Sequence, residues 1–243
     1  MSRRHNAHVR CPRCYMHGSL CVCSLMPTLE TRTRLILVIH RIEARKPSNT
    51  GRLGALCLTN SETWIRGHEE KRVDAYMPAE NCQPLFLFPH DDATPIAAFA
   101  GPKGTCSTRH SEKPIHLIVP DGTWRQASKV RNRVAGFKSI PCVSLPADAP
   151  SIYRLRSEAH AHGLATIEAI ARAFGILEGP ENGPRVRSEI EHVFRAMVER
   201  TLWSRGEIET ENVHGGIPEG AMRHDPRSGK LQSRRELLPE FNR

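Results

Sequence analysis

The stretch from Ile115 to Ala135 constrains the fold more than any other part of the sequence. Its first residues, 115–119, form an apolar run rich in β-branched side chains, which is typical of a buried strand. After a proline, Asp121-Gly-Thr-Trp124 form a turn that leads into a basic helix. Thr123 and Gln126 have the spacing of a capping box, so this helix is predicted to start at Thr123. The stretch therefore predicts a strand, a tight turn and a helix in succession.

Other segments repeat this alternation. Further strands are predicted at Arg34–His40, Leu85–Phe88 and Ser139–Leu145, with an edge-like strand at Thr63–Arg66. Apolar residues at helical spacing predict a helix over Gly163–Leu177, and Asn182-Gly-Pro184 are predicted to start the last helix. Strands that alternate with helices indicate an α/β fold with a mainly parallel sheet.

Three polar loops each follow a predicted strand: Lys46–Leu53, Asp121–Trp124 and Ser151–Arg156. Because the carboxyl ends of parallel strands lie on one edge of a sheet, where ligands bind, these loops are predicted to form one pocket. A structural alternative stays open for each loop. Asp and Thr are common at such junctions because they cap helices, and a tryptophan there is more often part of the core.

Four cysteines lie within 13 residues near the start of the chain, in the pattern C-x2-C-x6-C-x-C. Four thiolates this close can surround one tetrahedral Zn²⁺, so the predicted metal ligands are Cys11, Cys14, Cys21 and Cys23. Free thiols, a redox pair at Cys11 and Cys14, and an iron–sulfur cluster are the alternatives. Four arginines suited to phosphate contacts surround the cysteines: Arg3, Arg4, Arg10 and Arg13.

The charge of the chain points to a polyanionic partner. The formal net charge is +9 and the sequence pI is about 9.4, which favours RNA or DNA, with an anionic membrane surface as the second candidate. No apolar run approaches the length of a membrane span, and the N-terminus lacks the apolar segment of a secretory signal. A cytoplasmic location is therefore expected, with reduced or metal-bound cysteines.

The composition divides the chain into three parts. Residues 1–28 are predicted to form the cysteine knuckle, residues 29–203 the main α/β domain, and residues 204–243 a largely disordered polar tail. Cys57, Cys82, Cys106 and Cys142 are interpreted as buried or incidental, and His160 and His162 as surface residues.

Several of these segments together resemble one known family. Asp121-Gly-Thr-Trp124 matches the D-x-T-W motif of the DTW-domain family. The sequence KPSNTGRL at 46–53, Tyr153-Arg-Leu-Arg156, Thr166-Ile-Glu-Ala169 and the cysteine-rich start are similar to the other blocks of that family, in the same order. The resemblance extends from about Cys11 to Phe194.

The resemblance implies a tRNA-uridine aminocarboxypropyltransferase. Such an enzyme would transfer the 3-amino-3-carboxypropyl group of S-adenosylmethionine to N3 of a uridine and release methylthioadenosine. In bacterial members the uridine lies in the variable region of tRNA. The family is similar to SPOUT-type enzymes, whose chain forms a trefoil knot. Two rival hypotheses stay open: a SPOUT-like RNA methyltransferase, and a non-catalytic zinc-knuckle RNA-binding protein.

A monomer and a homodimer are both possible oligomeric states. The resemblance also implies roles for individual residues. The predicted catalytic residues are Asp121, Thr123 and Trp124. The predicted cofactor-binding residues are Asn49, Thr50, Gly51, Pro120, Gly122, Leu145, Tyr153, Arg154, Leu155 and Arg156. The predicted residues for tRNA binding are Lys46, Arg52, Arg125 and Glu168. Asp121 is expected to accept the N3 proton or to orient the uridine, or alternatively only to hold the cofactor or its loop.

Overall fold

The structure is a computed structural model that describes residues 9–44, 46–67, 76–101, 113–155, 163–221, 223–225 and 230–231. The chain divides into two compact units. The sheet unit consists of residues 27–151 and 158–191, and the cysteine unit consists of residues 1–26, 152–157 and 192–243. Helix α5 (Gly179–Ser204) contributes residues to both units.

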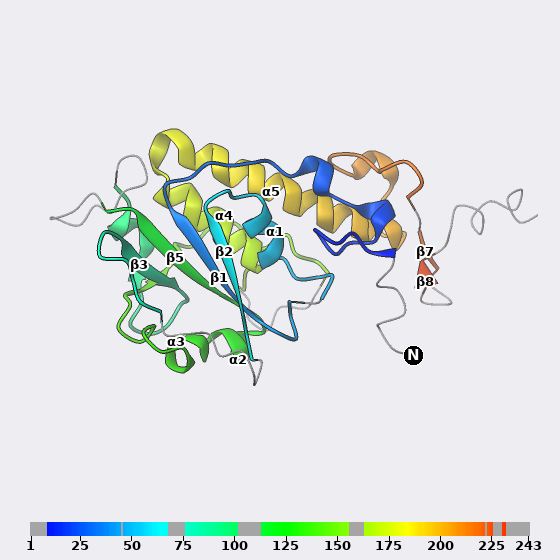
Figure 1. Cartoon of the computed structure of the whole chain (residues 1–243). Coiled ribbons are helices and arrows are strands. Elements are labelled where there is room, and N and C mark those ends of the chain that lie inside the picture. The colour runs from blue at the N-terminus through cyan, green and yellow to red at the C-terminus, as the bar shows by residue number, and fades with distance from the viewer. Residues whose placement is uncertain are drawn as a thin grey trace, which may run out of the picture. The chain divides into compact units, whose positions relative to one another are not determined.

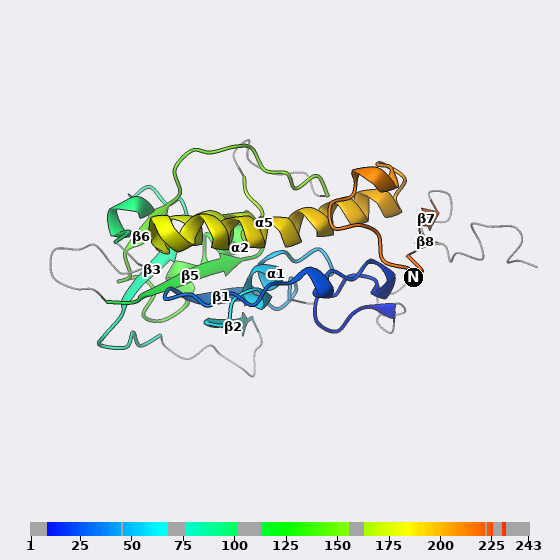
Figure 2. The same cartoon turned by 90° about the horizontal axis from the view of Figure 1, so that it is seen from above.

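The sheet unit is built on six strands that are parallel in every pairing. Their order is β2-β1-β5-β3-β6-β4, and Figure 2 shows this order from β2 to β6. The strands are β1 (Arg34–His40), β2 (Ser61–Arg66), β3 (Gln83–Leu87), β4 (Thr94–Pro95), β5 (Ile115–Asp121) and β6 (Cys142–Ser144). The predicted α/β fold with a mainly parallel sheet is confirmed, while the trefoil knot stays a prediction.

The two central strands are buried on both faces. The five middle residues of β1 are buried, and so are the last five of β5. On one face, Ile36, Phe86 and Ile118 pack with Phe137 in a cluster of buried apolar side chains. Helices α1 (Gly51–Leu56) and α4 (Thr166–Leu177) contact β1 and β5 respectively. Figure 1 shows α4 above the sheet and the helices that follow β5 below it. Continuous apolar runs are what strands covered on both faces require.

The basic segment after β5 forms two short helices, α2 (Trp124–Ala127) and α3 (Val130–Arg133), where one helix is predicted. The predicted capping box is present. The Thr123 hydroxyl accepts from the Gln126 N–H at 3.3 Å, and the Gln126 side chain accepts from the Thr123 N–H at 2.8 Å. A continuous helix would place Lys129 one turn from two arginines, and such like-charge pairs disfavour helix.

Other elements also differ from the prediction, and β2, β3 and α4 do so by two or three residues at one end. Strand β6 is shorter than the predicted Ser139–Leu145, and β4 was not expected. β4 is only two residues long and lies at the sheet edge, where Pro95 removes no hydrogen bond that the sheet needs. α5 begins at Gly179 rather than at Asn182, because Pro180 fits the first helical turn and leaves Pro184 inside the helix.

Helices α4 and α5 approach each other closely at two glycines. A Cβ atom on Gly183 would lie 2.2 Å from the Gly175 carbonyl oxygen, a distance that no side chain can adopt without movement of the backbone. Gly183 is buried. The absence of a side chain at this position therefore sets the separation of the two helices.

The cysteine unit contains short 3-10 helices and one well-bonded arginine. These helices are η2 (Gly18–Leu20), η3 (Cys23–Leu25) and η6 (Thr210–Asn212), and strands β7 (His224–Asp225) and β8 (Lys230–Leu231) pair antiparallel. The buried guanidinium of Arg200 donates to the carbonyls of Cys21, Gly215 and Gly216. It thereby joins the knuckle to part of the segment after Ser204. The boundaries 1–28, 29–203 and 204–243 stay a prediction.

None of the helices in the described residues combines the length and the apolar character that crossing a bilayer requires.

Replacing Gly183 with alanine is expected to lower the free energy of unfolding by about 1–3 kcal/mol, the usual cost of overpacking. The new methyl group would force α4 and α5 apart at the Gly175 carbonyl. Urea denaturation of Gly183→Ala measures the effect. Glu181→Ala is the control, since Glu181 is exposed on the same helix. Equal stability of the two variants would contradict this account.

Candidate functional site

Two of the predicted polar loops, Lys46–Leu53 and Asp121–Trp124, lie at the carboxyl edge of the sheet. Asp121 is the last residue of β5 and stands opposite Ile39, one residue before the end of β1. The chain that follows β1 returns to this edge at Asn49 and Thr50, just before α1. The sheet therefore brings the Lys46–Leu53 and Asp121–Trp124 loops to the same place.

The carboxylate of Asp121 is the point at which three segments meet. The Asn49 side-chain amide donates to its Oδ2 atom, and the Thr166 hydroxyl donates to its Oδ1 atom at 2.5 Å. Only 6% of Asp121 is exposed. Hydrogen bonds to a charged group stabilise a fold by about 1.5–3 kcal/mol each. This carboxylate therefore ties the end of β5 to the loop before α1 and to the first residue of α4.

The loop before α1 fits closely against that carboxylate. The Asn49 side-chain oxygen accepts from the Arg52 N–H at 3.0 Å, so Asn49 both caps α1 and reaches Asp121. A Cβ atom on Gly51 would lie 3.0 Å from the Thr166 methyl carbon and 3.1 Å from the Asp121 carboxyl carbon. Gly51 therefore leaves little free space between the loop, β5 and α4.

Trp124 lies beside this point and is half-buried. Its ring stands edge-to-face against Phe88, with 5.3 Å between the ring centroids. Phe88 directly follows β3, so one edge of the indole packs on the sheet end. Thr123 is exposed, and its hydroxyl is used in the capping box. This position is compatible both with packing alone and with stacking on a base or an adenine.

Two of the residues predicted to bind tRNA have partners within the protein. The Glu168 carboxylate is 5% exposed and accepts from the Ala165 N–H at 2.8 Å and from the Ser151 hydroxyl at 2.5 Å. Lys46 forms an ion pair with the buried Glu43. Arg125 is exposed and Arg52 is half-buried. The contacts of Glu168 are those of a residue that caps α4.

The remaining predicted cofactor residues divide between the two units. Thr50 precedes α1, Pro120 is buried in β5, Gly122 starts the turn, and Leu145 directly follows β6. Residues 153–155 belong to the cysteine unit, where the buried Tyr153 ring packs on Phe194 at 5.6 Å. Arg154 is exposed, and Arg156 lies outside the described residues.

The structure adds Thr166 to the predicted residues around Asp121. It is the first residue of α4 and belongs to the Thr166-Ile-Glu-Ala169 block, but no role followed from the sequence. Its only local signal is a hydroxyl in the first turn of a helix. That signal is shared by many surface residues.

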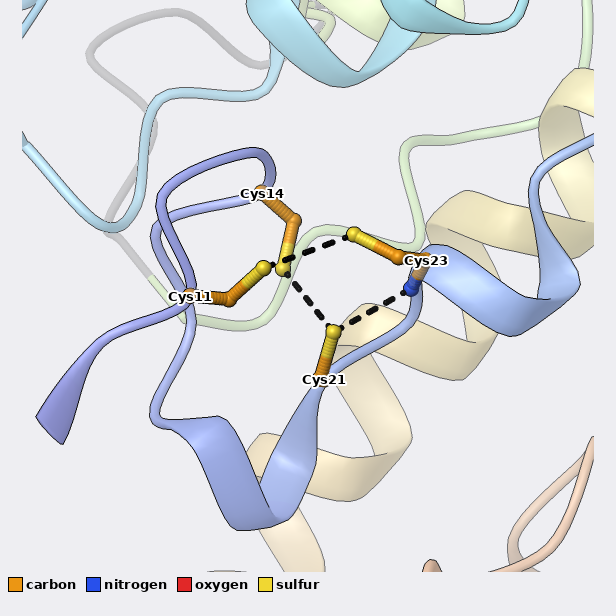
Figure 3. A group of neighbouring side chains, drawn as sticks. All are labelled: Cys11, Cys14, Cys21 and Cys23. Atoms are coloured by element: carbon orange, nitrogen blue, oxygen red, sulfur yellow. Dashed lines mark hydrogen bonds between the residues drawn. The ribbon is translucent and has the colours of Figure 1, made fainter.

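The four N-terminal cysteines converge on one point, as Figure 3 shows. The Sγ atoms of Cys11 and Cys23 are 3.5 Å apart, those of Cys14 and Cys21 are 3.7 Å apart, and all four lie within 4.8 Å of one another. Four sulfurs at 2.3 Å from a tetrahedral Zn²⁺ would be about 3.8 Å apart. The observed spacing therefore fits a single metal ion.

The thiols of this cluster differ in acidity. Burial raises the pKa of Cys14 to about 11, even though backbone hydrogen bonds oppose the change. Burial also acts to raise the pKa of Cys11, but hydrogen bonds from the backbone of Cys14 and Arg13 and from neighbouring thiols outweigh it and lower the pKa to about 6. A cation held among the sulfurs would favour all four thiolates.

The family model described as "DTW domain" matches residues 8–202. The chain belongs to the DTW domain family. This confirms the resemblance that the D-x-T-W motif and the accompanying blocks indicate. The match includes the Asp121 contacts and the four cysteines of this DTW protein.

Three curated relatives of this DTW protein carry the name tRNA-uridine aminocarboxypropyltransferase 2. The mouse (Mus musculus) relative is 27% identical over 177 residues, which are 69% of this chain and 56% of the relative. The Drosophila melanogaster relative is 23% identical over 180 residues, 71% of this chain and 68% of the relative. The chain thus spans about half the length of the mouse relative. No solved structure matches it.

Replacing Asp121 with asparagine is expected to destabilise this DTW protein by about 1–3 kcal/mol, because the new amide would face the Asn49 amide. The double variant Asn49→Asp/Asp121→Asn restores a donor–acceptor pair and still lets residue 49 accept from the Arg52 N–H. Urea denaturation of both single variants and of the double variant measures the coupling. Additive losses in the double variant would show that the contact contributes nothing.

Proposed function

We propose that this chain is a tRNA-uridine aminocarboxypropyltransferase that uses S-adenosylmethionine and modifies a uridine at N3. The observation that carries the proposal is the family match over residues 8–202, together with the name shared by the relatives. The net charge of +9 suits a nucleic-acid substrate. The variable region of a bacterial-type tRNA is the proposed target. Residues 1–28, 29–203 and 204–243 are proposed as knuckle, catalytic domain and tail of a cytoplasmic enzyme.

The reaction is a displacement at the γ-carbon of the methionine part of S-adenosylmethionine. Uridine N3 gives up its proton and forms a bond to this carbon. The bond from the carbon to the sulfonium breaks, and its electron pair leaves the sulfur as the neutral thioether of methylthioadenosine. The protein must hold the carbon in line with N3 and provide an acceptor for the proton.

We propose that Asp121 contributes by position rather than as the proton acceptor. Both of its oxygens accept hydrogen bonds from the protein, and 6% of the residue is exposed. A positioning role requires only the contacts that exist, whereas a base must also be reached by the uridine. In this role Asp121 holds the Asn49 loop and the start of α4 in the arrangement that binds the cofactor.

Further residues are proposed to bind the cofactor and the tRNA. Trp124 stacks on the adenine or the uracil with the part of its ring that Phe88 leaves uncovered. Arg154 or Arg156 binds the carboxylate of the methionine part, as guanidinium groups commonly do. Arg52 and Arg125 contact the tRNA. The proposed cofactor-contacting set is Asn49, Thr50, Gly51, Pro120, Gly122, Leu145, Tyr153, Arg154, Leu155 and Arg156.

We further propose that the metal ion of the cysteine unit is Zn²⁺. The support is that all four sulfurs lie within 4.8 Å of one another, and that four thiolates are a common ligand set of structural zinc. Zinc there would fix the knuckle, and with it the Arg200 contacts to the carbonyls of Cys21, Gly215 and Gly216.

Incubation of the full chain with S-adenosylmethionine and unmodified tRNA is expected to release methylthioadenosine and to yield 3-(3-amino-3-carboxypropyl)uridine, both measured by mass spectrometry. Asp121→Asn should lose about 100-fold in rate, as misplaced reacting groups do. Asn49→Asp/Asp121→Asn should recover most of the rate if Asp121 acts by position. A stable double variant that still binds S-adenosylmethionine but is inactive would instead identify Asp121 as the base. Adenosylhomocysteine as the co-product would identify a methyltransferase.

Metal analysis of the purified chain is expected to find one zinc per molecule. Cys14→Ser should lower the zinc content, because it replaces the most deeply buried of the four ligands. Cys57→Ser is the matched control, since the buried Cys57 thiol donates to the Leu53 carbonyl and belongs to the sheet unit. Zinc should be released as the pH falls, because protons compete for the thiolates. Equal zinc content in the two variants would exclude the cluster as the site.

A further inference from the structure

Cationic side chains gather at the carboxyl ends of β1 and β2. His40 ends β1 and stands opposite Arg66, which ends β2. The Arg41 N–H donates to the Arg66 carbonyl at 2.9 Å. Burial lowers the pKa of Arg66, and the charge of Arg133 lowers it further. Burial also lowers the pKa of His40, and Arg66, Arg41 and Arg133 add to that effect while Glu43 opposes it. The charges of three arginines thus act on one imidazole.

Arg66 is the most informative member of this group. It is 9% exposed, and its Nη1 atom is buried with no hydrogen-bond partner among the residues that the structure describes. Burying a guanidinium without an anion is unfavourable, so proteins normally pair it. Here the charged group that lowers its pKa is another cation, Arg133. Among the described residues, Arg66 therefore lacks the anion that normally neutralises a buried guanidinium.

The opposite ends of the same two strands provide a contrast. Arg34 begins β1, and its guanidinium pairs with the Glu62 carboxylate of β2 at 2.7 Å. The seven-residue strand separates the two ends by about 20 Å. The arginine at the amino end is therefore neutralised by its neighbour, whereas no such pair is present at the carboxyl end within the described part of the chain. Arg34 and Arg66 therefore differ in whether a carboxylate pairs with the guanidinium, although both lie on the same pair of strands.

The group lies next to the D-x-T-W turn. The Gln126 side-chain nitrogen lies 3.4 Å from the His40 Nδ1 atom, and the same side chain closes the capping box on Thr123. Ile39, the residue before His40, stands opposite Asp121 in the sheet. Every one of these residues belongs to the sheet unit. An anion bound here would therefore sit beside the residues that hold the proposed reaction site.

We propose that Arg66, Arg133, Arg41 and His40 bind a phosphodiester group of the RNA substrate beside the D-x-T-W turn. The identification of the anion with RNA rests on the proposed function. A phosphodiester offers acceptor oxygens that two or three guanidinium groups can contact at once. The contact would fix the backbone of the strand whose uridine enters the site, so it positions the substrate without reading its sequence.

The test measures the affinity of the full chain for fluorescently labelled, unmodified tRNA by anisotropy over a range of KCl concentrations. Arg66→Gln/Arg133→Gln should weaken binding about tenfold or more at low salt and reduce the slope of log K against log[KCl] by about one, the value for one lost phosphate contact. Arg34→Gln is the matched control and should keep the slope, because Glu62 already neutralises Arg34. An unchanged slope in the double variant would overturn the proposal.

A second double variant tests the site without changing the buried Arg66. Arg41 and Arg133 are exposed, so Arg41→Gln/Arg133→Gln tests the site even if substitution of the buried Arg66 prevents folding. This pair should show the same direction of change in affinity and slope. Wild-type behaviour in a folded Arg41→Gln/Arg133→Gln variant would exclude these two arginines and overturn the proposal as stated.

Titrations with other ligands separate this proposal from its alternatives. Binding of S-adenosylmethionine, measured by calorimetry, should be unchanged in Arg66→Gln/Arg133→Gln, and a loss of cofactor affinity with an unchanged RNA slope would assign the group to the cofactor instead. Tight binding of inorganic phosphate that this variant abolishes, again with an unchanged RNA slope, would indicate a free anion. If wild-type protein shows the predicted RNA behaviour but releases no methylthioadenosine, the proposed function fails while the phosphate site stands.

Discussion

The buried carboxylate of Asp121 is the interaction on which the arrangement of this sheet edge depends. It is the only group described that accepts from both the Asn49 amide and the Thr166 hydroxyl, so it sets where α1 and α4 begin relative to β5. Gly51 fits against it with almost no space to spare. The D-x-T-W motif therefore acts first as a structural joint, and its proposed role in the reaction follows from what the joint holds in place.

The parts of the fold that could be predicted from the sequence are those in which the local pattern and the burial agree. β1 and β5 are continuous apolar runs because both faces are covered, and Thr123 with Gln126 forms the predicted capping box. The prediction missed the break between α2 and α3, which we attribute to repulsion between like charges. It also placed the start of α5 too late, because Pro180 fits the first turn of that helix. β4 was not predicted, because two residues are too few to show the alternation of apolar and polar residues that is typical of a strand.

For the site, the sequence indicated Asn49 and Asp121 through their motifs, but not that they touch. Thr166 has no pattern that separates it from other residues in a first helical turn. Arg66 was equally hidden, because whether an arginine at a strand end has a counter-charge is decided by the neighbouring strand and helix. Arg34, on the same pair of strands, has the same residue type and the opposite outcome. The sequence gives the residue types, but it does not show which of these residues contact one another in the fold.

The all-parallel sheet has a consequence for how the chain acquires this edge. Parallel neighbours cannot be joined by hairpins, so each pairing needs a long crossover. Asn49 and Asp121 are 72 positions apart, and Asp121 and Thr166 are 45 apart. Closing such loops is entropically unfavourable until most of the native contacts exist. A chain that has collapsed but has not completed its crossovers would thus lack the joint altogether, and ligand binding at this edge would report complete folding rather than local order.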